Sequence, residues 1–237
     1  MTARENRGEV RSRLFKAIEA GEVEEVRDLL QLDARLARQP NAEGASPLLW
    51  AAYYRQREIC KLLLDHGAEA DVFEASALDL DDRVKELLRA DRSWVERYSY
   101  DGWTPLHLAG HFGSVKVMRT LIANGASHRA VSRNSNGNQP LQAAAAGRQV
   151  EAVKMLLKVG ADVNARSEGG FTAIHIAAAN GDEAIARALL GAGAVVDVRA
   201  EGGKTPMDIA IDADHGAIVD LLETTGSGGR PDAPDAH

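Results

Sequence analysis

Apolar residues recur along the chain in short segments with the spacing of one face of an α-helix. In one segment they occupy positions 115, 117, 118, 121 and 122, with polar residues between them; this pattern predicts an amphipathic helix. Such segments end in a pair of large aliphatic residues. The pairs are Leu29–Leu30, Leu63–Leu64, Leu87–Leu88, Leu121–Ile122, Leu156–Leu157, Leu189–Leu190 and Leu221–Leu222. The pattern therefore predicts seven units that each contribute one such helix.

A second, shorter and often Ala-rich segment precedes most of these helices and repeats in register. Its five copies are SPLLWAA (46–52), TPLHLAG (104–110), QPLQAAA (139–145), TAIHIAA (172–178) and TPMDIAI (205–211). Thr104 followed by Pro105 predicts a capped helix start, and small alanine side chains let neighbouring helices approach closely. Because helices this short are unstable alone, the units must stack to form a core.

The five copies are separated by 58, 35, 33 and 33 residues, and the largest spacing contains an additional, shortened unit. Moving the segment that begins at Phe15 by 58 residues aligns FKAIEAGEVEEVRDLLQLDA with FEASALDLDDRVKELLRADR. We therefore place a repeat that has lost the TPLH signature between Val72 and Tyr98. The spacing of 35 adds two residues to segment 129–139, which predicts one longer loop.

The TPLHLA motif at 104–109, the GADVNA motif at 160–165 and the 33-residue period resemble the ankyrin-repeat family. The resemblance extends from about Leu14 to Glu223 and is greatest to compact, stand-alone bacterial members. It implies a mainly α solenoid of about seven helix-turn-helix units with β-hairpin-like loops. We expect this domain at 12–225, a polar extension at 1–11, and a disordered tail at 226–237, where Gly, Pro and acidic residues lack apolar anchors.

The chain departs from the family pattern at the turn between the two helices of a unit. The family places a glycine there, as at Gly113 and Gly181, whereas Arg55 and Arg148 occupy the same position in two other units. These two turns are expected to differ in conformation or to carry backbone strain.

Composition and charge argue against some classes of partner. The 237 residues carry a formal net charge of −7, and 45% of them are hydrophobic, as is typical of a globular protein. An acidic chain is a poor binder of phosphate backbones, so we expect no nucleic-acid partner. Without an apolar run long enough for a membrane helix or a secretory signal, the chain is expected to be cytoplasmic, with no membrane partner.

Several residues suggest catalysis or nucleotide binding, but their context favours a structural role. Gly203-Lys204-Thr205 ends like a phosphate-binding loop, yet position 198, where the loop requires glycine, is Val198. Cys60, the single cysteine, stands among the apolar residues of a predicted helix, which is typical of a buried side chain rather than a nucleophile. We predict no enzymatic activity and no cofactor.

Two histidines have the spacing of paired zinc ligands. His107 and His111 stand four residues apart, but no third ligand is close in the sequence. By resemblance to the family, His107 and His175 occupy the TPLH position, where the imidazole connects neighbouring turns by hydrogen bonds. We therefore expect structural histidines and no bound metal.

Aromatic residues are concentrated in one part of the chain: nine of the eleven lie within residues 50–112. By resemblance, several of them occupy exposed, concave positions that ankyrin proteins vary to select partners, and exposed Trp and Tyr residues commonly dominate protein interfaces. The predicted partner-binding residues are Tyr53, Tyr54, Tyr100, Asp101, Trp103, His111 and Phe112. The alternative is that these rings fill a packing gap beside the shortened repeat.

Together these observations predict a monomeric, non-catalytic scaffold that binds a partner protein on the concave face of repeats 2–4. Two alternatives remain open. An acidic partner or ligand could bind around the longer loop at Arg129, Arg133, Arg148 and Arg166. The chain could instead be an accessory or regulatory subunit of an enzyme.

Overall fold

The computed structural model describes residues 7–227 of the chain. The remaining parts of the predicted extension (1–6) and tail (228–237) lie outside this range. The described residues form fourteen α-helices and no β-strand. The helices are α1 (Arg7–Ala20), α2 (Val23–Leu32), α3 (Pro47–Tyr53), α4 (Arg57–Asp65), α5 (Val72–Ala77), α6 (Asp81–Ala90), α7 (Pro105–Phe112), α8 (Val115–Ala123), α9 (Pro140–Ala146), α10 (Val150–Lys158), α11 (Ala173–Asn180), α12 (Glu183–Gly191), α13 (Pro206–Asp212) and α14 (Gly216–Ser227). They form seven consecutive pairs, which confirms the predicted helical solenoid.

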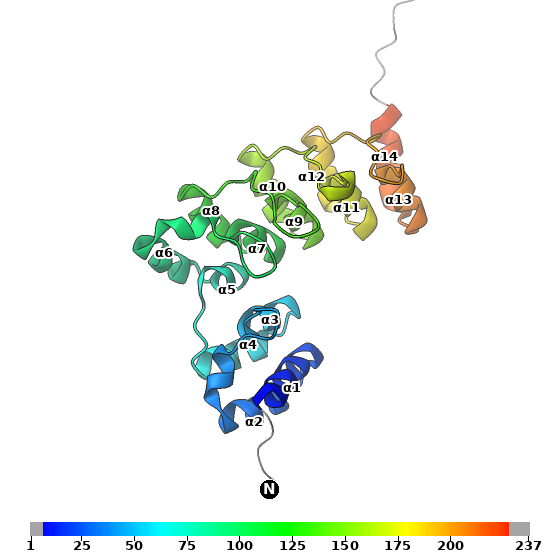
Figure 1. The fold of residues 1–237 in the computed structure, drawn as a ribbon. Helices are drawn as coiled ribbons and strands as arrows, with labels where there is room; N and C mark the ends of the chain where they lie inside the picture. The colour runs from blue at the N-terminus through cyan, green and yellow to red at the C-terminus, as the bar shows by residue number, and fades with distance from the viewer. Residues whose placement is uncertain (1–6, 228–237) are drawn as a thin grey trace, which may run out of the picture.

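The pairs stack side by side into an arc with two layers of helices (Figure 1). The odd-numbered helices form the inner layer, where each packs against the next odd-numbered helix, and most even-numbered helices do the same in the outer layer. The exception is α4 and α6, which make little contact, so the outer layer is interrupted at the shortened third repeat. No helix between residues 7 and 227 has the length and apolar character needed to span a membrane.

The predicted aliphatic pairs form the core between the two layers. Leu63, Leu121, Leu156 and Leu189, one from each of four outer helices, are fully buried. The inner helices contribute mainly alanine, and the fully buried segment 143–145 of α9 is Ala-Ala-Ala. These small side chains let consecutive inner helices approach closely, and the repeats therefore share one continuous core.

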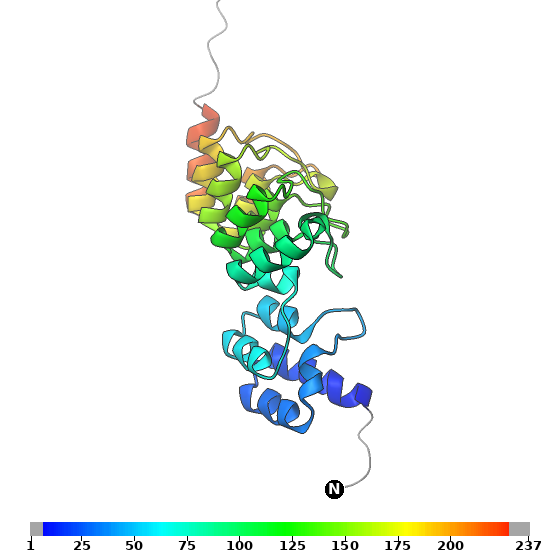
Figure 2. The same cartoon turned by 90° about the vertical axis from the view of Figure 1, so that its left-hand side faces the viewer.

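Five of the loops that lead from an outer helix to the next inner helix form a narrow turn, here called a finger. Each finger is closed by a backbone hydrogen bond of 2.8–3.0 Å between its first and last residues. The fingers are residues 41–45, 99–103, 132–138, 167–171 and 200–204, and Figure 2 shows them on one side of the stack. The longest, 132–138, is the predicted longer loop. The third repeat has no finger, because α5 begins only seven residues after the end of α4 at Asp65.

The turn between the two helices of every pair contains one residue in the left-handed conformation. Glycine occupies this position in three pairs, and a larger residue with φ of 55–62° occupies it in the other four. These residues are Gly21, Arg55, Asp79, Gly113, Arg148, Gly181 and Asp214. Arg55 and Arg148 therefore adopt the backbone conformation of the family's glycine, and the predicted strain is present because the Cβ atom disfavours positive φ.

Replacing Arg55 by glycine should raise the free energy of unfolding by about 0.5–1 kcal/mol. Glycine avoids the Cβ clash, and its greater freedom in the unfolded chain offsets part of the gain. Urea denaturation of the purified variant measures the change. Asp79→Gly is the matched control, since Asp79 has nearly the same φ as Arg55. The Asp79 carboxylate also accepts a hydrogen bond from the Val117 N–H, 3.3 Å away. Because glycine loses this bond, Asp79→Gly should be less stable than wild type. If Arg55→Gly brings no gain, the turn stores no strain.

Candidate partner-binding site

The missing finger of the third repeat brings the predicted site residues together. Tyr53 and Tyr54 stand at the end of α3 and His111 and Phe112 at the end of α7, while Tyr100, Asp101 and Trp103 lie on finger 99–103. The fingers of repeats 2 and 4 approach each other here, since a Cβ atom on Gly44 would lie 3.4 Å from that of Tyr100. Elsewhere, backbone hydrogen bonds such as that from the Arg133 N–H to the Gly102 carbonyl connect neighbouring fingers.

Four of these residues form a packed group of rings. The centroid of the Tyr53 ring lies 5.4 Å from that of Phe112 and 6.4 Å from that of His111. The His111 ring in turn lies 5.1 Å from Trp103 and 5.0 Å from Phe112, both in edge-to-face geometry. Edge-to-face contacts of this kind stabilise beyond the burial of area alone. The group joins α3 to α7 across the third repeat.

Asp101 connects the tyrosines to the finger. Its carboxylate accepts hydrogen bonds from the Tyr53 hydroxyl and from the Ser99 hydroxyl. The pKa of Tyr53 is raised, chiefly by burial and secondly by the charge of Asp101, and burial raises that of Tyr100 as well. Both phenols therefore stay protonated at neutral pH and can donate hydrogen bonds. Ser99 was not among the residues predicted from the sequence, although its position two residues before Asp101 is a common signal of such a turn.

Trp103 is not an exposed residue, contrary to the sequence-based prediction. Its side chain is 8% exposed, and its ring packs against His107 and His111 at centroid distances of 6.0 and 5.1 Å. The physical reason is that the ring packs onto these two histidines of α7 instead of extending into solvent. For Trp103, the alternative interpretation of a packing residue is the correct one.

The other predicted residues differ in exposure. Tyr54 and Tyr100 are exposed at 44% and 38%, whereas Tyr53, Asp101, His111 and Phe112 are half-buried. The Trp50 ring packs against the Tyr54 ring, with 5.5 Å between the two centroids. Tyr54 and Tyr100 are therefore the two exposed residues of the predicted set.

The histidine of the TPLH motif has the structural role that the resemblance implies. His107 is fully buried; its Nδ1 accepts a hydrogen bond from the Thr104 hydroxyl at 2.7 Å, and its Nε2–H donates to the Asn138 carbonyl of the next repeat at 2.8 Å. Burial lowers the pKa of His107 to about 4, so the ring is neutral. Gln142 makes the equivalent connection one repeat later, donating to the Ala165 carbonyl at 3.1 Å.

The residues considered for chemistry occupy unreactive surroundings. Cys60 is 5% exposed, and burial raises the pKa of its thiol to about 11, which leaves little thiolate at neutral pH. Between residues 7 and 227, no three His, Cys, Asp or Glu side chains converge as metal ligands would.

The four arginines of the alternative site do not form one surface. Arg148 lies in the turn between α9 and α10, at the opposite end of α9 from finger 132–138, and pairs with Asp182 at 2.9 Å. Arg133 stacks over the Tyr98 ring at 3.8 Å, and Arg166 donates to the Arg199 carbonyl. Arg129 is exposed. The prediction that all four surround the longer loop is wrong for Arg148, because the turn and the finger lie at different ends of the helix.

Comparisons with known proteins agree with the repeat architecture. A family model described as "Ankyrin repeats (3 copies)" matches residues 3–74 and 72–167, and one described as "Ankyrin repeats (many copies)" matches residues 158–210. A putative ankyrin repeat protein of fowlpox virus is 30% identical over 165 residues, which cover 66% of this chain and 37% of the viral protein.

Two other relatives show how widely the likeness extends. Human neurogenic locus notch homolog protein 2 is 32% identical over 146 residues, 58% of this chain and 6% of its own length. A probable E3 ubiquitin-protein ligase of Oryza sativa is 37% identical over 122 residues, 47% of this chain and 24% of its own length. The chain thus spans well under half the length of each of these relatives, and the likeness to bacterial members stays a prediction.

Proposed function

The chain belongs to the ankyrin-repeat family, whose repeats generally mediate protein–protein interaction, and from this premise we propose that it is a non-catalytic scaffold that binds a partner protein on the concave face of repeats 2–4. We place it in the cytoplasm as a monomer. A partner that covers the inner helices and fingers of three repeats could form an interface of standard size, about 1,600 Å² in total.

The observation that carries this proposal is the pair of exposed tyrosines, Tyr54 and Tyr100, in the part of the chain that also holds the packed rings. Tyrosine offers a large apolar ring with few rotatable bonds and a hydroxyl that donates hydrogen bonds, which is why it is frequent among the residues that dominate binding energy. The Tyr54 ring packs against Trp50 at a centroid distance of 5.5 Å, which restrains it before a partner arrives. Such preorganisation lowers the entropic cost of association.

Replacing both exposed tyrosines, Tyr54→Ala/Tyr100→Ala, should weaken partner binding about thirtyfold or more, because hot-spot side chains typically contribute 2 kcal/mol or more. Affinity capture with the full chain as bait would identify the partner, and titration of the purified partner would measure the loss. Phe171→Ala is the matched control, since Phe171 is equally exposed at 38% but lies on the finger of repeat 6. Undiminished binding by the double variant, or loss with Phe171→Ala, would place the partner elsewhere.

A further inference from the structure

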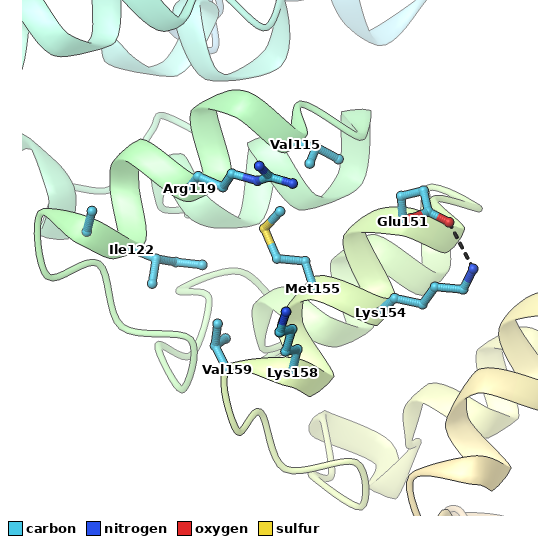
Figure 3. A pocket seen from close by; sticks show the side chains of 9 residues that line it. Val115, Arg119, Ile122, Glu151, Lys154, Met155, Lys158 and Val159 are labelled. Carbon is cyan, nitrogen blue, oxygen red and sulfur yellow. Dashed lines mark hydrogen bonds and ion pairs between the residues drawn. The ribbon is translucent and has the colours of Figure 1, made fainter.

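A groove separates the outer helices α8 and α10, on the layer opposite the tyrosines (Figure 3). Its volume is about 550 Å³. Each helix contributes one stripe of side chains at helical spacing, and Figure 3 shows Met155 pointing from α10 toward α8. The lining residues are Val115, Arg119, Ile122 and Ala123 from α8, and Glu151, Lys154, Met155, Lys158 and Val159 from α10 and its end.

The floor of the groove contains two apolar residues, Met155 and Val159, that are larger or more apolar than their counterparts in the neighbouring repeats. Val159 is 37% exposed at the residue before the glycine that ends its helix, a position that Asn124 and Ala192 fill in the neighbouring repeats. Met155 is half-buried and likewise replaces smaller or polar residues, Thr120 and Ala188. A flexible, polarizable methionine on a partly open surface suits contact with a partner's apolar side chains.

The rim of the groove is basic in an acidic protein. Helix α8 carries Lys116 and Arg119 and no acidic residue, while α10 carries Lys154 and Lys158 against the single Glu151. Lys154 pairs with Glu151 at 2.9 Å, but Arg119 and Lys158 have no carboxylate partner within residues 7–227. Arg83 and Lys85 of α6 and Arg187 of α12, in contrast, are paired with acids on their own helix.

We propose that this groove binds an acidic amphipathic helix of a partner protein, as a second docking surface independent of the concave face. Each bordering helix has nine residues, so the groove runs for about 13 Å, or two to three helical turns. A bound helix would place apolar residues at positions i, i+3 or i+4 and i+7 on the floor. Its carboxylates would then face Arg119 and Lys158, which supplies the charge complementarity that sets specificity.

The test uses a synthetic 16-residue peptide with leucine on one helical face and glutamate on the other, titrated against the full chain by fluorescence anisotropy. Arg119→Glu/Lys158→Glu should weaken binding at least tenfold, and affinity should fall as salt rises. Lys61→Glu/Arg89→Glu makes the same change in net charge at exposed positions of α4 and α6 and should change binding less than twofold. A peptide with lysine in place of glutamate should not bind.

Five outcomes would overturn the proposal. The first three are no binding of the glutamate peptide at millimolar concentration, equal binding by the Arg119→Glu/Lys158→Glu variant, and equal binding of the lysine peptide. The fourth is binding of phosphatidylserine vesicles through Arg119 and Lys158 without binding of the peptide, which would make the groove a lipid site. The Tyr54→Ala/Tyr100→Ala variant should bind the peptide as wild type does, so this proposal and the one for the concave face are tested separately. The fifth outcome is loss of peptide binding in that variant, which would place the peptide on the concave face.

Discussion

Replacing Gly147 by alanine should lower the free energy of unfolding by about 3 kcal/mol. Gly147 follows α9 with φ of −74° and ψ of −5°, a conformation that alanine adopts without strain, so the backbone angles do not require glycine. A Cβ atom there would lie 1.9 Å from the His111 carbonyl oxygen and 2.7 Å from its carbon. Because these are backbone atoms of α7, the clash is relieved only by moving α7 away from α9, and such overpacking costs 1–3 kcal/mol or more.

Gly191→Ala is the matched control for this prediction. Gly191 is the last residue of α12, and a Cβ atom there would meet nothing within 4 Å. Alanine is favoured over glycine in a helix by about 0.5–1 kcal/mol, so the same substitution should stabilise here. Chemical denaturation of both variants measures the two changes. Effects of the same sign would contradict a steric origin of the loss at Gly147.

Most of the fold could be predicted from the sequence because each repeat carries its own local signals. Thr104 caps α7 as its position before Pro105 predicts, and the aliphatic pairs are buried where their spacing places them. Even the shortened third repeat follows from the alignment of Phe15 with Phe73. A repeat protein favours such predictions, since nearly all contacts lie within one repeat or between neighbours.

The candidate site was less predictable because it depends on what the third repeat lacks. The loss of the TPLH signature could be read from the sequence, but not that residues 41–45 would come to lie beside residues 99–103 or that Trp103 would pack onto the histidines of α7. Nothing in the spacing around Trp103 distinguishes it from exposed Tyr100, three residues away. The groove between α8 and α10 could not be predicted for a different reason: its two stripes belong to helices that begin 35 residues apart in the sequence.

Glu74 illustrates how the third repeat compensates for its missing finger. It occupies the helix position that His107 and Gln142 fill in other repeats, the third residue of a capped inner helix. Those side chains donate a hydrogen bond forward to the next finger, whereas Glu74 connects backward to repeat 2. It accepts hydrogen bonds from the Ser46 hydroxyl at 2.5 Å and from the Asp71 N–H at 3.1 Å.

The surroundings of Glu74 favour the protonated acid. Its side chain is 6% exposed, and burial, reinforced by Asp71, raises its pKa to about 8 from an ordinary 4.5. The folded protein therefore holds a proton that the unfolded chain releases between these two values. The folded state binds more protons in this window. The stability that Glu74 contributes is therefore fully present below pH 4.5 and is lost as the pH rises toward 8. The buried His107, whose pKa is lowered, acts in the opposite direction below its ordinary value of 6.5.

Glu74→Gln should separate these contributions, because the amide is neutral at every pH and can still accept from the Asp71 N–H while donating to the Ser46 hydroxyl. The histidines are unchanged, so their effect cancels in the difference between variant and wild type. That difference in unfolding free energy should grow in favour of the variant by about 4 kcal/mol between pH 5 and 8, at about 1.4 kcal/mol per pH unit. Urea denaturation at several pH values measures it. Glu58→Gln removes the same charge from an exposed position of α4 and should leave the wild-type pH dependence intact. A difference for Glu74→Gln that stays constant with pH would mean that the carboxyl group titrates alike in the folded and unfolded chains, and that the junction of repeats 2 and 3 is open to water.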